Sequence, residues 1–386
     1  MRSDLIIIGG GIIGLSLAFF AVRAGKSVRL IEAEALGAGT TSASFAWANA
    51  STKTTDVPYH RLNAAGLALY RTLAREFGQS ALGINPTGAL QIVRQSDPAG
   101  YQAMLRDAEI LTGFGYGAEL LSHDALRTIA PELHLAKDAE ALHLKDDLVV
   151  DAPGFTRFLG EQIVQAGGHI QFARALTLLA DDAGQIEGIE TTAGVFHAPN
   201  VVTAVGKDTG ALLAQLTGHA PLARQFPLRE VPGLLLTTPP LPRLAPRHLV
   251  YTSTRDELHF LPLADGRIRL GSDDIDAMIW EDRSDATMQK AGNALLGRGN
   301  AFLPGLIHAV RVEDCDLAVG IRPYPEDGKS IIDQFPGATG LFTIATHSGI
   351  TLAPVLGHLM SQWLTSGGRP DALAPFALSR FSGFAA

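Results

Sequence analysis

Three glycines near the N-terminus are the first residues whose type and spacing could do chemistry. Gly9, Gly11 and Gly14 form a Gly-x-Gly-x-x-Gly turn directly after the apolar run Leu5 to Ile8. This spacing is typical of a dinucleotide-binding turn between a strand and a helix. Gly9 permits the tight turn, Gly11 lets the backbone approach a pyrophosphate, and Gly14 allows close packing of helix on strand.

An acidic residue follows where a dinucleotide site needs one. Glu32 closes a second apolar run, Val28 to Ile31. Its carboxylate can accept hydrogen bonds from a ribose 2′-hydroxyl and repels a 2′-phosphate, so NADP is disfavoured. The pyrophosphate would bind the amides at the helix start, at Ile12 and Ile13, where the helix dipole is positive. This fingerprint alone does not separate NAD from FAD enzymes.

Helices and strands with period-3.6 and period-2 patterns surround this turn. Residues 33–57 have no such period, and a loop this long inside a domain is usually functional. Residues 98–130 look mostly helical, and residues 221–271 alternate strands with turns. A β-rich middle between two α/β blocks indicates a nucleotide domain interrupted by a sheet domain. The predicted helices are 12–24, 58–77, 155–166, 284–297 and 350–364, and the predicted strands include 5–8, 28–31, 200–204 and 340–345.

Composition narrows the class of protein. The 386 residues favour two domains, and 46% apolar with 18% charged residues allows a large core. The net charge of −8 argues against nucleic-acid binding, and no apolar run is long enough to predict a membrane span. Cys315 is the only cysteine, so no disulfide within the chain is expected and a reducing, cytoplasmic location fits. The chain enters its first strand at once, so a cleaved signal peptide is not expected. No residues have metal-ligand spacing.

Three further segments carry a family resemblance. Residues 39–47 read Gly-Thr-Thr-Ser-Ala-Ser-Phe-Ala-Trp, and residues 200–206 read Asn-Val-Val-Thr-Ala-Val-Gly. Residues 320–323 read Gly-Ile-Arg-Pro, and residues 347–354 read His-Ser-Gly-Ile-Thr-Leu-Ala-Pro. With the opening fingerprint, these segments resemble the FAD-dependent D-amino acid oxidase superfamily, in a pattern like its glycine oxidase and D-amino acid dehydrogenase members.

The resemblance implies an α/β protein with a discontinuous Rossmann-like FAD-binding domain and a second, α+β substrate domain on a mainly antiparallel sheet. The FAD-binding domain would comprise residues 1–85, 141–220 and 319–386. The substrate domain would comprise residues 86–140 and 221–318.

The same resemblance assigns cofactor contacts. The Thr-Thr-Ser segment would contact the pyrophosphate and ribityl chain of FAD, and the residues after it would run along the flavin ring. The family usually has glycine at Ala46, and a large residue at Trp47 is a departure. Leu176 falls where a backbone amide and carbonyl hold the adenine. A helix start near Gly349 would face the flavin N1–C2=O edge. The predicted cofactor residues are Gly9, Gly11, Ile12, Ile13, Gly14, Glu32, Ala33, Thr40, Thr41, Ser42, Ala46, Trp47, Ala48, Leu176, Gly206, Arg322, Ser348, Gly349, Ile350 and Thr351.

The mode of flavin attachment also follows from the resemblance. Some members attach flavin covalently through a cysteine. This chain has Gly320 at that place, and Cys315 lies five residues earlier. The resemblance therefore predicts non-covalent FAD.

Arg322 is the predicted substrate residue. Its counterpart in the family clamps the substrate carboxylate, which suits the planar fork of arginine. The alternative for this residue is a structural ion pair with Asp314 or Asp316. His259 falls where glycine oxidase carries an active-site tyrosine, and could contact the substrate carboxylate or tune the amine. Tyr251 and His347 are the other catalytic candidates.

The implied reaction is oxidation of the CH–NH bond of a small amino acid, either a D-amino acid, glycine, or a cyclic or N-substituted amino acid. Hydride would pass to flavin N5, and the imine would hydrolyse to a keto acid. Oxygen or a carrier such as a quinone would accept the electrons. Three alternatives stay open: a 2-hydroxy acid substrate, a flavoprotein subunit of a hetero-oligomeric dehydrogenase, and an NAD dehydrogenase. A homo-oligomer is equally compatible with the sequence.

Overall fold

A six-stranded sheet carries the N-terminal fingerprint. The structure is a computed structural model that describes residues 2–215, 223–252 and 257–384. The sheet has the order β19-β20-β13-β1-β2-β9, and every pair is parallel except β19 with β20. The chain departs from β1 to either side, so the turn after β1 lies at the topological switch point, where open α/β sheets bind ligands. The strands are β1 (Leu5–Ile8), β2 (Val28–Glu32), β9 (His169–Phe172), β13 (Asn200–Thr203), β19 (Ile331–Gln334) and β20 (Leu341–Ala345).

Helices cover this sheet through close backbone contacts. Helix α1 (Ile12–Arg23) packs on α12 (Gly349–Ser366), where a Cβ at Gly357 would lie 2.6 Å from the carbonyl oxygen of Ser16. Helix α2 (Val57–Phe77) crosses the start of α12, where a Cβ at Gly66 would lie 2.2 Å from the Thr351 oxygen. Helix α6 (Ala152–Gln165) packs beside α1. The small residues at these crossings bring the helix starts close to the β1 turn.

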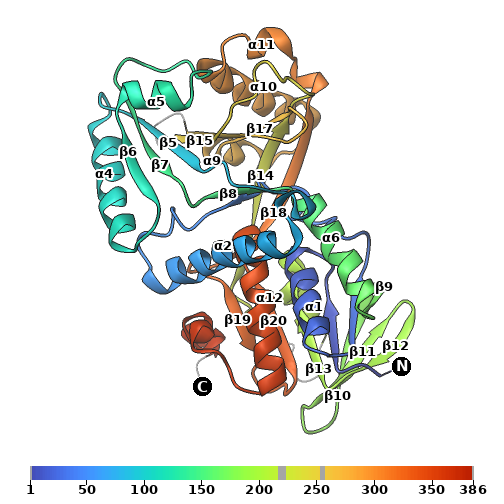
Figure 1. Cartoon of the computed structure of the whole chain (residues 1–386). Helices are drawn as coiled ribbons and strands as arrows, with labels where there is room; N and C mark the ends of the chain where they lie inside the picture. The colour runs from blue at the N-terminus through green and yellow to red at the C-terminus, as the bar shows by residue number, and fades with distance from the viewer. Residues whose placement is uncertain (1, 216–222, 253–256, 385–386) are drawn as a thin grey trace.

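An eight-stranded sheet forms the second part of the molecule (Figure 1). Its order is β18-β14-β17-β16-β15-β5-β7-β6, antiparallel throughout except for the parallel pair β15 and β5. One apolar face packs against α10 (Asp285–Phe302), and Phe260 and Leu270 are completely buried there. The strands are β5 (Ala89–Arg94), β6 (Ala118–Leu121), β7 (Ala139–Leu144), β14 (Leu228–Thr237), β15 (Leu249–Thr252), β16 (Leu258–Pro262), β17 (Ile268–Gly271) and β18 (Asp316–Pro325).

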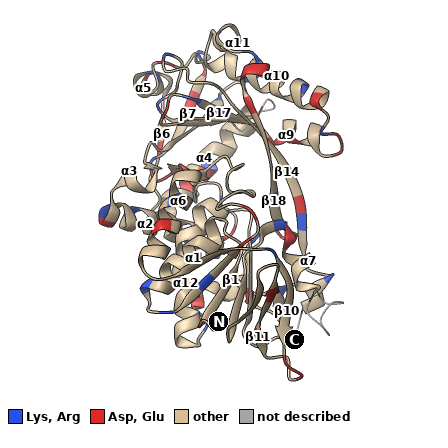
Figure 2. Ribbon diagram, turned by 90° about the vertical axis from the view of Figure 1, so that its right-hand side faces the viewer, with Lys and Arg blue, Asp and Glu red and all other residues tan. Residues whose placement is uncertain are grey.

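Two long strands join the two sheets. β14 and β18 pair over ten residues, from Leu228 opposite Pro325 to Thr237 opposite Asp316. Figure 2 shows this ribbon running down from the eight-stranded sheet toward the fingerprint sheet. The division into 1–85, 141–220 and 319–386 against 86–140 and 221–318 stays a proposal. Its boundaries at 141 and 319 fall inside β7 and β18, and the boundary at 220 lies outside the described residues.

The remaining elements are short or peripheral. Two small sheets contain β10 (Ala175–Ala180), β11 (Ile186–Thr191) and β12 (Gly194–His197), and β3 (Trp47–Ala48), β4 (Ile84–Asn85) and β8 (Leu148–Val150). Further helices are α3 (Gln79–Leu82), α4 (Pro98–Gly113), α5 (His123–Ile129), α7 (Thr209–Leu213), α9 (Asp273–Asp276) and α11 (Leu306–Ala309). No helix in the described part of the chain is long and apolar enough to span a membrane.

The structure corrects two details of the sequence interpretation and adds to a third. Residues 98–130 are mostly helical, as expected, but β6 lies between α4 and α5 and pairs with β7. Helix α6 begins at Ala152 rather than at residue 155, with Pro153 in its first turn, where proline is tolerated. The loop 33–57 contains the short strand β3, which pairs with β8. Strands β3 and β6 are too short to show a period in the sequence. Each of them pairs with a strand further along the chain, so no local pattern predicts it.

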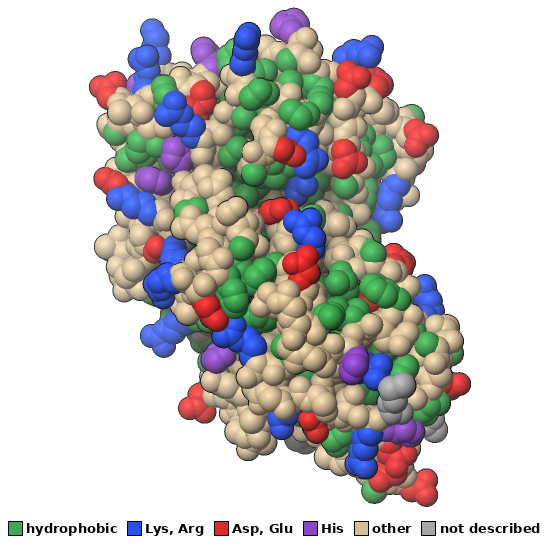
Figure 3. All heavy atoms as spheres, turned by 45° about the vertical axis from the view of Figure 1, so that its right-hand side comes forward, with side chains coloured by type: hydrophobic (Ala, Val, Ile, Leu, Met, Phe, Trp, Pro, Cys, Tyr) green, Lys and Arg blue, Asp and Glu red, His purple; other side chains and the backbone are tan. Residues whose placement is uncertain are grey.

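Acidic and basic side chains are interspersed on the molecular surface. On the face in Figure 3, neither sign forms a continuous field.

A candidate flavin and substrate site

Glycine is present at the three fingerprint positions for different structural reasons. Gly9 has a φ of +109°, and a Cβ there would lie 2.4 Å from the Ala204 oxygen. A Cβ at Gly14 would lie 2.0 Å from the Gly9 oxygen. A Cβ at Gly11 would meet only the Thr41 hydroxyl, at 3.4 Å. Gly9 and Gly14 are therefore required by the turn itself, whereas Gly11 faces space that the protein leaves open.

The groups predicted to hold the adenosine end converge on this turn. Helix α1 has Gly11 as its N-cap and no side-chain cap, and the Ile12 amide donates to the Thr41 hydroxyl at 3.2 Å. The Glu32 carboxylate accepts the Gly10 amide at 2.6 Å and the Glu34 amide at 2.7 Å. The acid thus lies beside the glycine turn, where the sequence predicts the ribose.

The loop after β2 is fixed against β18. The Thr40 hydroxyl donates to the Ile321 carbonyl at 2.6 Å. A Cβ at Gly320 would lie 2.3 Å from the Ala43 oxygen, so only glycine permits this approach without a shift of the backbone. The Ser42 hydroxyl, predicted to contact the cofactor, donates within its own loop to the Ala38 and Gly39 carbonyls.

Ala46 has a conformation that glycine normally adopts. Its φ is +65°, and it is the only non-glycine residue with positive φ among those that the structure describes. An L-residue pays a steric cost in this region because its Cβ approaches the following carbonyl. This steric cost explains why glycine is usual at this position in the family.

Trp47 and Ala48 continue into β3. The Trp47 indole N–H donates to the Asp147 carboxylate at 2.8 Å, and the ring lies 5.6 Å from the Tyr251 ring. Asp147 also accepts the hydroxyls of Ser51 at 2.8 Å and Tyr116 at 2.5 Å. Asp147 is completely buried, and burial raises its pKa to about 7.

Sequence reasoning missed this buried carboxylate. The segment Lys145-Asp146-Asp147 looks like an ordinary polar turn, and no local pattern marks its second acid as buried. Lys53 lies close enough to Asp147 for an electrostatic interaction, but burial dominates and lowers the lysine pKa to about 8. The network orients the indole at the position where the sequence departs from the family.

The C-terminal motif meets both the fingerprint and β3. A Cβ at Gly349 would lie 3.9 Å from both Ile12 and Ile13. The Thr351 hydroxyl accepts the Asn49 amide at 3.1 Å, and the Ile350 carbonyl accepts the Tyr70 hydroxyl at 2.7 Å. Ser348 accepts the Tyr59 hydroxyl at 2.8 Å. The start of α12 therefore lies between the segments predicted for the two ends of the cofactor.

Three further predicted cofactor residues are Leu176, Ala33 and Gly206. Leu176 is in β10 and its side chain is exposed, and Ala33 directly follows Glu32 at the end of β2. Gly206 follows β13 with a φ of +60°, and a Cβ there would lie 4.0 Å from Pro323. Their contacts with a cofactor stay predictions.

His259 and Tyr251 lie side by side on the eight-stranded sheet. They are register partners on β16 and β15, and the His259 ring contacts Phe45 edge-on at 4.5 Å. Burial lowers the pKa of His259 to about 4 and raises the pKa of Tyr251 to about 12. Both side chains are uncharged at neutral pH, so His259 cannot supply a positive charge to a substrate carboxylate.

His347 belongs to the same region. Its Nε2 lies 2.9 Å from the Gly328 carbonyl, and its ring stacks on Tyr324 at 4.3 Å. Burial, followed by the nearby charge of Lys53, lowers the His347 pKa to about 4. This histidine is also neutral at ordinary pH.

Arg322 is the fixed positive charge of this site. It forms ion pairs with Asp273 at 3.2 Å and with Asp276 at 2.9 Å. The ion pair that the sequence analysis gave as the alternative is therefore present, but with other acids than the examples named: Asp314 pairs with Arg311 at 3.4 Å. Asp273 and Asp276 reach Arg322 from α9 because β14 packs beside β18, a pairing that sequence distance hides.

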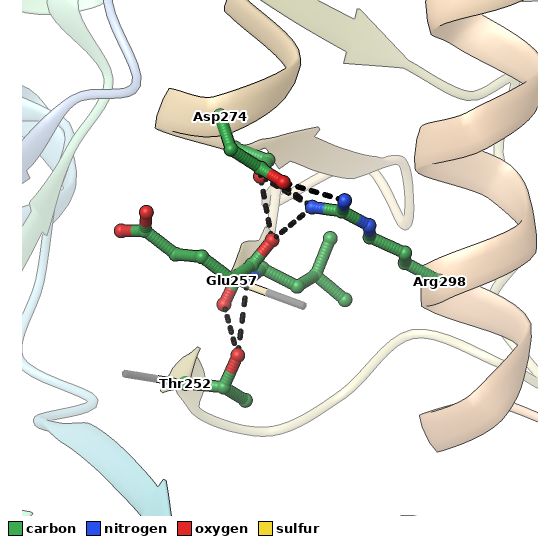
Figure 4. A network of polar contacts seen from close by, with 6 residues as sticks. Thr252, Glu257, Asp274 and Arg298 are labelled. Atoms are coloured by element: carbon green, nitrogen blue, oxygen red, sulfur yellow. Dashed lines mark hydrogen bonds and ion pairs between the residues drawn. The ribbon is translucent and has the colours of Figure 1, made fainter. Parts of the chain in front are cut away.

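A separate polar network fixes the position of α9. Both terminal nitrogens of Arg298 bind Asp274 at 2.6 Å, and Nη1 also donates to the Glu257 carbonyl at 2.7 Å (Figure 4). The Thr252 hydroxyl bonds the backbone of Leu258 on the neighbouring strand. Asp274 thus belongs to a structural pair, while its neighbour Asp273 belongs to the Arg322 pair.

Cys315 lies outside the candidate site. Its thiol donates to the Arg311 carbonyl, and its side chain packs against the core of the eight-stranded sheet. Burial raises its pKa to about 11. Among the described residues, no group of acids, histidines and cysteines could hold a metal ion.

The residues present fit an FAD molecule. An open cradle at Gly11, an uncapped helix start and an acid beside it suit the adenosine and pyrophosphate. The loop 40–48, β18 and the start of α12 converge beside them. The fold and the site together are those of a flavin-dependent oxidoreductase.

Comparison with known proteins agrees with this class. Residues 4–363 match the model of the DAO family, described as FAD dependent oxidoreductase. The chain belongs to this family, and its cofactor is FAD. The match extends over both sheets, so the two parts are features of one family fold.

Individual relatives are distant. Glycine oxidase of Geobacillus kaustophilus is 25% identical over 99% of this chain and 98% of its own length. A D-amino acid dehydrogenase of Cereibacter sphaeroides is 29% identical over 74% of this chain and 62% of its own length. The crystal structure of the Geobacillus glycine oxidase superposes with a TM-score of 0.81 at 24% identity, covering 98% of this chain and 99% of that one.

Proposed function

We propose that this oxidoreductase oxidises the CH–NH bond of a small amino acid to an imine, which water then hydrolyses to a keto acid and an amine or ammonia. Candidate substrates are D-amino acids, glycine, and cyclic or N-substituted amino acids. The single observation that carries the proposal is Arg322, a fixed cation beside uncharged His259, His347 and Tyr251. The activities named for the relatives support it.

The residues of the chain would orient the substrate rather than exchange protons with it. Arg322 would hold the carboxylate through its planar fork, which fixes two atoms of the substrate at once. Tyr251 and the neutral His259, whose rings contact Trp47 and Phe45, would line the substrate site together with this loop. FAD, when bound, would supply the acceptor for the hydride, which carries both electrons away from the substrate.

We also propose that FAD is bound non-covalently. Cys315 packs against the core of the eight-stranded sheet, and the backbone at Gly320 approaches Ala43 too closely for a cysteine side chain. Neither position therefore offers a thiolate for attachment. The proposed electron acceptor is oxygen or a carrier such as a quinone. The proposal is compatible with a partner subunit.

The proposal is tested by anaerobic titration of the purified holoprotein with a panel of D-, L- and imino acids. Bleaching of the flavin absorbance by at least one amino acid is expected, and no response to any amine would contradict the proposal. Reoxidation of the bleached protein by oxygen or by a quinone dye then identifies the acceptor.

Arg322 variants assign the role of the residue. Arg322→Lys keeps a positive charge beside Asp276 but loses the fork, so we expect KM to rise about tenfold or more while flavin absorbance is retained. Arg322→Ala should raise KM further. Loss of flavin or of cooperative unfolding in Arg322→Lys would show that the residue is structural.

A further inference from the structure

Both terminal nitrogens of the Arg322 guanidinium already have carboxylate partners from the same chain. The partners lie on one short helix, α9, that directly follows β17. A substrate carboxylate must therefore compete with an acid of the protein for this cation. The two acids differ in a way that decides which of them competes.

Asp276 is the fixed partner. Its side chain is 6% exposed, and it accepts the Leu234 amide at 2.7 Å in addition to Arg322. Asp273 is the accessible partner: its side chain is 59% exposed, and it contacts Arg322 at the longer distance of 3.2 Å. Asp276 can hold Arg322 in place while Asp273 moves off Nη1.

Asp273 also lies among the other residues of the candidate site. Its charge acts on His259, Tyr251 and His347. The two histidines are uncharged at neutral pH, and the nearby Glu257 adds a further acid whose pKa burial raises to about 7. Besides Arg322, two cations act on this region: Lys53 on His347 and Asp147, and Arg298 on Glu257.

We propose that Asp273 is a specificity-determining residue that selects substrates with an amino group next to the carboxylate. The inference rests on the proposed function. An amino acid would place its carboxylate on Arg322 and its ammonium group on Asp273, so both charges are satisfied. A 2-hydroxy acid or a simple carboxylate would bring a second negative charge next to Asp273, which disfavours binding.

The experiment compares three ligands that share one carbon skeleton. The amino acid that bleaches the flavin best is titrated anaerobically to give its apparent Kd. The corresponding 2-hydroxy acid and the deaminated carboxylate are titrated as competitors. The wild type, Asp273→Asn and Asp273→Glu are measured as holoproteins at neutral pH.

Asp273→Asn should bind the amino acid about tenfold more weakly, because a charged contact with the ammonium group is lost. It should bind both competitors about tenfold more tightly, because a repulsion of their carboxylate is removed. Asp273→Glu keeps the charge and should retain the wild-type preference. Asp274→Asn is the matched control, because it removes an equal charge from the same helix, pairs with Arg298 instead of Arg322, and keeps a side-chain oxygen that can still accept a hydrogen bond from Arg298 and hold α9 in place. Its ratio of amino acid to carboxylate affinity should stay close to wild type.

The inference would be overturned if Asp273→Asn left the ratio of amino acid to carboxylate affinity unchanged, or if Asp274→Asn changed this ratio by the same factor. Should Asp273→Asn lose its flavin, Asp273→Ser provides the same neutralisation with a smaller side chain. Failure of the proposed function is distinguishable: no amino acid would then bleach the wild type. In that case the carboxylate titrations alone still test Asp273, because Asp273→Asn should bind the carboxylate about tenfold more tightly than the wild type.

Discussion

Arg322 illustrates how the surroundings of one residue decide its use. As a bare guanidinium it would bind any carboxylate. In the fold it has a buried acid on one nitrogen and an exposed acid on the other, and its Nε is buried without a partner. The affinity of the site for anions is therefore set by α9 as much as by Arg322.

The charge state of His259 follows from burial. Its pKa of about 4 lies below the ordinary value, so the folded state resists protonation between about pH 4 and 6.5. A group with a depressed pKa of this kind makes folding stability fall as the pH drops through that window. The role expected of His259 is that of a neutral neighbour of the substrate.

At the residue scale, the strained backbone of Ala46 gives a stability prediction. Ala46→Gly relieves a left-handed conformation that costs an alanine about 1–2 kcal/mol, against about 0.4–1 kcal/mol of added chain entropy in the unfolded state. We expect the free energy of unfolding to be unchanged or about 1 kcal/mol higher, measured by urea denaturation.

Ala48→Gly is the matched control for this variant. Ala48 is completely buried in β3 and has no positive φ, so glycine there removes a packed methyl group and adds only entropy. It should lose about 1 kcal/mol or more of stability. Equal losses in the two variants would mean that Ala46 is not strained.

At the element scale, small residues determine how helices meet the cofactor loop. The starts of α1 and α12 lie beside one another, and the Gly357–Ser16 crossing fixes the distance between the two helices. The strand β18 is held to the loop 40–48 in the same way at Gly320. The site is thus assembled from elements that approach at backbone distance.

The crossing of α1 and α12 reverses the usual effect of a glycine-to-alanine change. In an open helix this change stabilises by about 1 kcal/mol, which we expect for Gly297→Ala in α10, where a Cβ meets nothing within 4 Å. Gly357→Ala places a Cβ 2.6 Å from the Ser16 backbone and should destabilise by about 1–3 kcal/mol. Thermal unfolding of both variants measures the difference, and a stabilised Gly357→Ala would refute the close crossing.

At the scale of the whole molecule, the cofactor would contact segments from both ends of the chain. The fingerprint, the loop 40–48 and the start of α12 meet around it. A ligand that binds only the folded state stabilises it by mass action, by about 2.7 kcal/mol at a concentration 100 times Kd. FAD should therefore raise the unfolding temperature of the whole chain.

Gly11→Val tests this coupling. The protein leaves open space at Gly11, so the apoprotein should unfold at nearly the wild-type temperature, yet added FAD should neither colour nor stabilise it. Gly113→Ala in α4, where a Cβ also meets nothing within 4 Å, should bind FAD normally. A yellow Gly11→Val protein would contradict the assignment of this turn to the pyrophosphate.

The sequence by itself determined the family, the cofactor and the general architecture. The information is local: glycine spacing, the acid after β2 and the Gly-Ile-Arg-Pro segment are contiguous patterns with one physical use. Long periodic helices such as α1, α2 and α12 were predicted almost to the residue, because their apolar faces repeat within each segment.

Only the tertiary structure decided which charges meet. Asp273 and Asp276 reach Arg322 across 46 residues or more, and Asp147 reaches Trp47 across 100. Such pairs have no local signature, because an acid before a turn looks the same whether it is solvated or buried beneath another strand. The pairing of β14 with β18 and of β3 with β8 fixes their burial, and burial sets their charge and partners.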